Sequence, residues 1–213
     1  MGKVSLLCLS LLLLAGCAHY PLPNLPDDFK ASVVSKDVLE DKPDVASMQV
    51  LIMYGAIVCN HTALRLHCPS KGVLFWDPGG GYATEGFVKT KRYKNVIRDN
   101  PPTVNDYMHW RTLIPTSSSE IFVWEGQTHE ICKLYDYIDK ASLQGRYNGF
   151  KTQTPGLFCS TAVSNFLQDK AQSFINVEGA FFPHNLSKKL HEEKSADNVY
   201  IVDHANDTVR VLH

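Results

Sequence analysis

The chain lacks an excess of charge of either sign. Its 213 residues include 21 lysines and arginines against 22 aspartates and glutamates, for a formal net charge of -1. The densest basic stretch, Lys89 to Arg92, is short and typical of a solvated loop. Domains that bind nucleic acid concentrate positive charge on one face, so this balance predicts no nucleic-acid partner.

Apolar runs long enough for a transmembrane helix are also missing. The run from Val4 to Leu14 is much shorter than the roughly 20 residues that a spanning helix needs. It follows a basic head at Lys3 and is typical of a secretory signal. The Leu-Ala-Gly-Cys segment that ends at Cys17 resembles a bacterial lipobox, in which the signal is removed before a cysteine that receives lipid.

We therefore expect a lipid-anchored protein of the bacterial cell envelope. Residues 1–16 would be a lipoprotein signal peptide, and Cys17 would carry the lipid that holds the protein to the membrane. Residues 17–45, which begin with a proline-rich stretch, are predicted to be a tether. Ala18 after the cysteine favours the outer membrane, with the domain facing the periplasm.

Cysteine is scarce in the remainder of the chain. Beyond Cys8 and Cys17, the six cysteines include Cys59, Cys68, Cys132 and Cys159. Four are too few for a disulfide scaffold. Cys132 lies in a helical pattern and is interpreted as a core residue. Pairing of Cys59 with Cys68 would require the chain to fold back between them, and the sequence leaves open whether Cys59, Cys68 and Cys132 form any disulfide.

Motifs for a cofactor or a metal are not evident. The glycine run after Pro78 is not followed by the Gly-Lys-Ser/Thr of a phosphate loop. Cys59, His61, His67 and Cys68 are metal-type ligands in a short stretch. On one continuous strand, however, His61 and His67 would lie roughly 20 Å apart and could not share an ion. We expect no cofactor and no metal.

Residues 46–213 are predicted to form one α+β domain of antiparallel strands and a few helices. The expected strands are 50–66, which could be two strands broken near Gly55 or Asn60, then 73–77, 120–124, 198–203 and 208–212. The expected helices are 128–145 and 159–171, with a short irregular helix between 89 and 116. A turn at 69–72 would join the first strands as a hairpin, and 198–212 would form another.

Cys159 is the candidate nucleophile. A turn-forming stretch places it on the first turn of a helix, where unpaired amides and the helix dipole favour a thiolate. A thiol nucleophile needs a base and a group that orients the base. His61 on one strand and Asp77 at the end of the next would lie at the same end of an antiparallel pair. Glu85 and Glu125 are substitutes for Asp77, which also suits a turn before Pro78.

These residues resemble the papain-like NlpC/P60 superfamily. The segment from Tyr147 through Gly149 to Cys159 is similar to its nucleophile segment, although Phe158 and Thr161 replace a common aspartate and glycine. The histidine and aspartate strands precede the cysteine, an order that resembles the circularly permuted branch and its YaeF/YiiX lipoprotein-like group. That group is similar to lecithin retinol acyltransferase-type enzymes. The resemblance covers about residues 50–190 and implies an antiparallel sheet packed against the helix that carries the nucleophile.

The resemblance also implies thiol-dependent amidase or peptidase activity. Cys159 would attack a carbonyl, His61 would shuttle the proton, and Asp77 would hold His61. The Cys159 amide and the Tyr147 hydroxyl would stabilise the oxyanion, although Tyr147 also suits a packing role. The expected substrate is a peptide or a small amide, for example a cell-wall peptide. Acyl transfer or hydrolysis of lipid esters, and non-catalytic binding of peptide or lipid, stay open as alternatives, as does the oligomeric state.

Overall fold

The computed structural model describes residues 30–54, 61–78, 92–93, 96–111, 118–144 and 159–213. Within them a single antiparallel sheet has nine strands in the order β1-β9-β8-β7-β2-β3-β4-β6-β5. The strands are β1 (Ala31–Val34), β2 (Ser47–Tyr54), β3 (His61–Cys68), β4 (Gly72–Trp76), β5 (Arg92–Tyr93), β6 (Val96–Ile97), β7 (Ser118–Glu125), β8 (Asn198–Asp203) and β9 (Thr208–Leu212). Of the two interpretations of the run 50–66, the structure has the one with two strands, because β2 and β3 are separate and paired.

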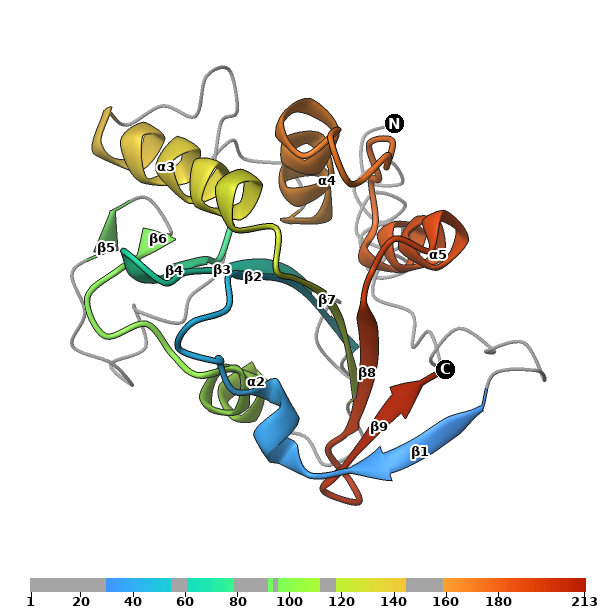
Figure 1. Ribbon diagram of the computed structural model, residues 1–213. Helices are drawn as coiled ribbons and strands as arrows, with labels where there is room; N and C mark the ends of the chain where they lie inside the picture. The colour runs from blue at the N-terminus through green and yellow to red at the C-terminus, as the bar shows by residue number, and fades with distance from the viewer. Residues whose placement is uncertain (1–29, 55–60, 79–91, 94–95, 112–117, 145–158) are drawn as a thin grey trace, which may run out of the picture.

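Helices cover both faces of this sheet (Figure 1). The helical elements are η1 (Lys36–Leu39), a short 3-10 helix, and α2 (Val104–Arg111), α3 (Thr128–Gln144), α4 (Cys159–Lys170) and α5 (Pro183–Glu193). Figure 1 shows α3, α4 and α5 on one face and α2 on the other. The predicted α+β class is confirmed. In the described part of the chain, none of the helices has the length and apolarity needed to cross a bilayer.

Two hydrophobic clusters lie on opposite faces of the central strands. Alternate residues of β2 point to opposite faces, so that Val50 and Ile52 join the cluster under α3, α4 and α5. Leu51 and Met53 join the cluster under α2. Every residue of β2 and β3 is buried. These strands therefore form a rigid platform between the two helical layers.

The candidate site lies at the open end of the β3–β4 hairpin, opposite its turn. Its register runs from Cys68 opposite Gly72 to Leu64 opposite Trp76, as the predicted turn at 69–72 requires. Gly72 has a φ of 84°, which glycine adopts without steric cost. The pairing stops at Trp76, and Pro78 two residues later has no amide hydrogen to continue it. Asp77 therefore lies just past the end of β4.

Helix α4 packs against β3 through its apolar face. The buried residues include Ala162, Val163, Phe166 and Leu167, as the helical spacing predicts. The ring of Phe166 meets Trp76 of β4 edge-on, with 5.6 Å between centroids. This contact holds α4 against the hairpin. The first turn of α4 then lies over the open end of the β3–β4 hairpin.

The segment assigned to a tether is partly folded. The structure places residues 31–45 in the domain, because β1 pairs with β9 and Leu39 is buried. Asp41 forms an ion pair with Arg65 of β3. The side chains of β1 are largely exposed, as on an edge strand, so no apolar run marks it in the sequence. Residues 1–29, including Cys17 and the predicted signal peptide, lie outside the described residues.

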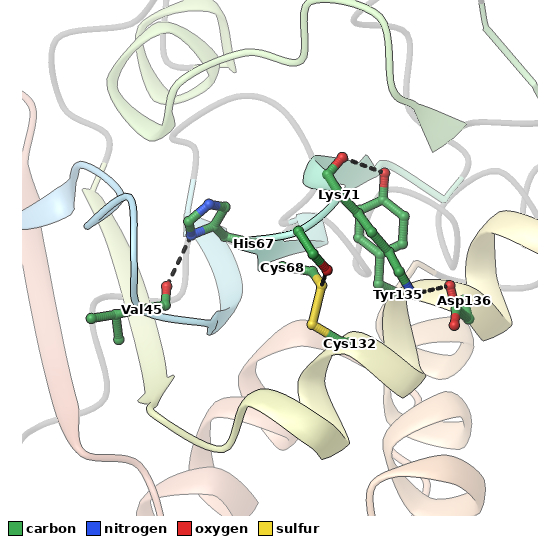
Figure 2. Close-up of a disulfide and its surroundings, with 8 residues drawn as sticks. Val45, His67, Cys68, Lys71, Cys132, Tyr135 and Asp136 are labelled. Carbon is green, nitrogen blue, oxygen red and sulfur yellow. Dashed lines mark hydrogen bonds and ion pairs between the residues drawn. A yellow bond between two sulfur atoms is a disulfide. The ribbon is translucent and has the colours of Figure 1, made fainter.

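Cys132 is not a core thiol, contrary to the interpretation of its helical pattern. It forms a disulfide with Cys68, with the two Cα atoms 5.1 Å apart (Figure 2). The bond ties α3 to the end of β3, and Lys71 beside it makes an ion pair with Asp136 and accepts a hydrogen bond from Tyr135 at its carbonyl. The two cysteines are separated by 64 residues, so only the packing of α3 on β3 brings them together.

We expect this disulfide to stabilise the domain substantially. Closing a loop of this length restricts the unfolded chain and is worth about 4 kcal/mol in the chain-entropy estimate. Urea unfolding of the wild type with and without dithiothreitol should show this difference in the free energy of unfolding. The matched control is the double variant Cys68→Ala/Cys132→Ala, whose stability should not respond to dithiothreitol. Equal midpoints for the oxidised and reduced wild type would contradict the prediction.

Candidate active site

The imidazole of His61 and the carboxylate of Asp77 form a buried pair. His61 begins β3 opposite Met53, which belongs to the cluster on the α2 face. Its Nε2 donates a hydrogen bond to Asp77 Oδ1 at 2.6 Å. The side chains of His61 and Asp77 are 8% and 3% exposed, so water competes little for this bond. The predicted juxtaposition of these two residues is present. It arises because the last residue of β4 lies near the first residues of β3 in the antiparallel pair.

Cys159 approaches the same point from the opposite helical layer. It is the first residue of α4, and its sulfur accepts a hydrogen bond from the main-chain amide of Thr62 at 3.2 Å. Thr62 pairs with β2 but lies beyond the last residues of β3 that pair with β4. Its amide can therefore point at the sulfur instead of at a neighbouring strand. The structure thus brings Cys159, His61 and Asp77 together at one end of the sheet.

The electrostatic environment favours an imidazolium–thiolate pair. Burial alone would lower the pKa of His61, but the negative charges of Cys159 and Asp77 outweigh it and raise the pKa to about 9. Burial alone would raise the pKa of the Cys159 thiol. The charge of His61, together with hydrogen bonds from His61 and from the amides of Thr62 and Ser160, outweighs it and lowers the pKa below that of an ordinary cysteine.

The hydrogen bonds assign a role to each ring nitrogen of His61. Nε2 is occupied by Asp77, which leaves Nδ1 as the nitrogen for the sulfur of Cys159. An imidazolium donates from both nitrogens, so both bonds suit the charged form. The arrangement can therefore favour the thiolate and return a proton from Nδ1 to an atom bound next to the sulfur.

Tyr107 is a member of this cluster that sequence reasoning missed. Its hydroxyl donates a hydrogen bond to Asp77 Oδ1 at 2.6 Å, and the tyrosine is fully buried. It comes from α2, in the polar stretch where the sequence predicts only a short irregular helix. No periodic pattern or motif marks it, so the only available signal was a tyrosine within that short helix.

The other candidates do not join the described cluster. Tyr147, Glu85 and Cys59 lie outside the described residues. Glu125 ends β7 at the far end of the sheet, opposite Ser47, and pairs with Lys42. It is therefore not a substitute for Asp77.

The metal-type residues of β3 have separate partners. His67 lies at the other end of β3 from His61, as predicted, with its Nδ1 2.9 Å from the carbonyl oxygen of Val45 (Figure 2). Cys68 is in the disulfide. Among the described residues there is no group of three or more histidine, cysteine, aspartate or glutamate side chains placed to hold a metal ion.

Comparison with known proteins identifies no relative of this chain. No family model, no curated protein and no solved structure matches it. The geometry of the cluster is therefore the basis for assigning a function.

We expect Cys159 to react with iodoacetamide with an apparent pKa below that of an ordinary cysteine, because the thiolate is the reactive form. His61→Ala removes the positive charge and leaves the burial, so the apparent pKa should rise and alkylation at neutral pH should slow about tenfold or more. Mass spectrometry of the tryptic peptide 152–170, in which Cys159 is the only cysteine, measures the rate. An unchanged pH profile in His61→Ala would show that the two side chains are not coupled.

Proposed function

We propose that this protein is a cysteine hydrolase that cleaves amide bonds through an acyl-enzyme intermediate. The observation that carries the proposal is the convergence of Cys159, His61 and Asp77, with the sulfur and the imidazole each favouring the charged form of the other. Packing alone does not require a thiol at a helix start to face a buried histidine–carboxylate pair.

The proposed reaction has two stages. The Cys159 thiolate attacks the substrate carbonyl carbon, a C–S bond forms, and the carbonyl electron pair moves to oxygen. Main-chain amides at the start of α4, including that of Cys159, would stabilise this oxyanion. The oxyanion then collapses, the C–N bond breaks, and the amine leaves with the proton from His61. In the second stage His61 takes a proton from water, the hydroxide attacks the thioester, and the acid and the thiolate are released.

We infer that the fold is the circularly permuted papain-like arrangement and that the protein acts in the cell envelope. The strand bearing His61 and the segment bearing Asp77 precede the helix bearing Cys159, which is the permuted order. The Cys68–Cys132 disulfide supports an oxidising compartment, such as the periplasm. Together with the lipobox-like segment at Cys17, this favours an anchored envelope lipoprotein that acts on cell-wall peptides or related amides.

We expect Cys159→Ala to lower kcat/KM on a peptide or amide substrate about a thousandfold or more. His61→Ala should lower turnover about a hundredfold or more, while the protein stays folded. A panel of aminoacyl and peptidyl aminomethylcoumarin amides provides the measurement, with circular dichroism as the control for folding.

The pH profile of kcat/KM should be bell-shaped. Activity should rise with pH as the Cys159 thiolate forms, and fall as pH passes about 9 because His61 loses the proton that the leaving group needs.

Full activity of Cys159→Ala would contradict the enzyme proposal. A reactive thiol without turnover on any acyl substrate would favour a non-catalytic lipoprotein that binds peptide or lipid.

A second candidate function, hydrolysis or transfer of lipid acyl esters, is favoured by Phe181. The carbonyl of Phe181 accepts a hydrogen bond from Ser160, the residue after Cys159, at 2.8 Å. The residue is 51% exposed, and among the described residues the other exposed large apolar side chains are Val33 and Val38. The main chain of Phe181 therefore lies beside the start of the nucleophile helix, and an exposed aromatic residue there can bind an apolar acyl chain.

Phe181→Ser should then reduce the preference for p-nitrophenyl octanoate over p-nitrophenyl acetate about tenfold, because burial of an aromatic ring is worth about 1.5 to 3 kcal/mol. The ratio of the two kcat/KM values is the measurement. The control is Val33→Ser, which changes an exposed apolar residue on the distant edge strand β1 and should leave the ratio unchanged. An unchanged ratio in Phe181→Ser would leave amide hydrolysis as the favoured activity.

A further inference from the structure

We propose that Tyr107 is a positioning residue that holds Asp77 against His61 and thereby maintains the charge pair between His61 and Cys159. Its consequence for catalysis rests on the proposed function. The positioning itself concerns only the reactivity of the thiol and can be measured without a substrate.

One oxygen of Asp77 accepts both hydrogen bonds. Tyr107 Oη and His61 Nε2 each lie 2.6 Å from Asp77 Oδ1. The residues are 0%, 6% and 2% exposed for Tyr107, His61 and Asp77, so solvent does not replace either donor. A hydroxyl that donates to an ionised carboxylate makes a charge-assisted bond, which is stronger than a bond between neutral groups.

The hydroxyl of Tyr107 is itself held in place. The ring packs against Phe75 of β4, with 4.4 Å between centroids. Phe75 lies two residues before Asp77, on the same face of the hairpin. Val104 and Met108 of α2 are buried in the same cluster as Phe75. Tyr107 therefore connects Asp77 to a packed layer that does not depend on α4.

Asp77 needs such a connection because of its place in the chain. It follows the last paired residue of β4 and precedes Pro78, so the β3–β4 ladder does not extend to its backbone. Tyr107 gives Oδ1 a donor from α2, an element other than the strand that carries His61. The second hydrogen bond fixes Oδ1 relative to the sheet, and the carboxylate then orients His61.

The titratable side chains for which the structure gives a contact in this cluster are Asp77, His61 of β3, Tyr107 of α2 and Cys159 of α4. When Asp77 loses its fixed position, it stabilises the imidazolium less well. The thiolate then loses part of its counter-charge, and a higher pH is needed to form it.

A double-mutant cycle tests the proposal. The wild type, Tyr107→Phe, Asp77→Ala and the double variant are alkylated with iodoacetamide across pH, and Cys159 is followed in peptide 152–170. Tyr107→Phe should raise the apparent pKa of Cys159 by about half to one pH unit and slow alkylation about three- to tenfold at pH values well below that pKa. In the Asp77→Ala background the same change should add nothing, because the hydroxyl then has no carboxylate to position.

Two further variants keep the result decisive. Tyr135→Phe removes a hydroxyl that contacts the Lys71 carbonyl near the disulfide, and it should leave the profile unchanged. Phe75→Leu loosens the ring of Tyr107 without removing its hydroxyl, and it should give a smaller shift in the same direction, which covers the case in which Tyr107→Phe does not fold. An absent shift, or an equal shift with and without Asp77, would overturn the proposal. Absence of hydrolysis in the wild type would overturn the proposed function alone.

Discussion

The end of the β3–β4 ladder at Trp76 is the constraint on which the candidate site depends. Because Pro78 cannot donate a hydrogen bond, the pairing with β4 stops before it, and among the described residues no strand pairs with the first residues of β3 on that side. Two groups next to this interruption hydrogen bond outside the ladder. The Thr62 amide donates to the sulfur of Cys159, and the Asp77 carboxylate accepts from His61. A ladder that continued past Trp76 would have competed with the sulfur for the Thr62 amide.

The site joins residues from the two layers that pack on opposite faces of the sheet. Asp77 and Tyr107 belong to the α2 side of the sheet, whereas Cys159 comes with α4 from the other side. Only at an interrupted sheet end can groups from both layers meet. A buried pair of opposite charges costs free energy unless each charge is hydrogen bonded. Here the sulfur has donors from β3 and from the start of α4, and the imidazole has the carboxylate.

Sequence alone predicted the residues that sit on strong local signals. A helix start marks Cys159, a strand end before Pro78 marks Asp77, and hairpin topology brings His61 beside it. Tyr107 and the Cys68–Cys132 bond could not be predicted, because each depends on how a helix packs on the sheet. The edge strand β1 was missed for another reason, since exposed side chains produce no apolar periodicity.

The register of β3 connects the disulfide to the site. The strand begins with His61 and ends with Cys68, and a shift by one residue would send each side chain to the opposite face. His61 would then leave Asp77 for the opposite face of the sheet, while Cys68 would leave Cys132 on α3. The same register therefore satisfies the covalent bond at one end and the charge pair at the other. The disulfide excludes the slipped pairing, and in doing so it keeps the imidazole on the face where Asp77 and Tyr107 lie.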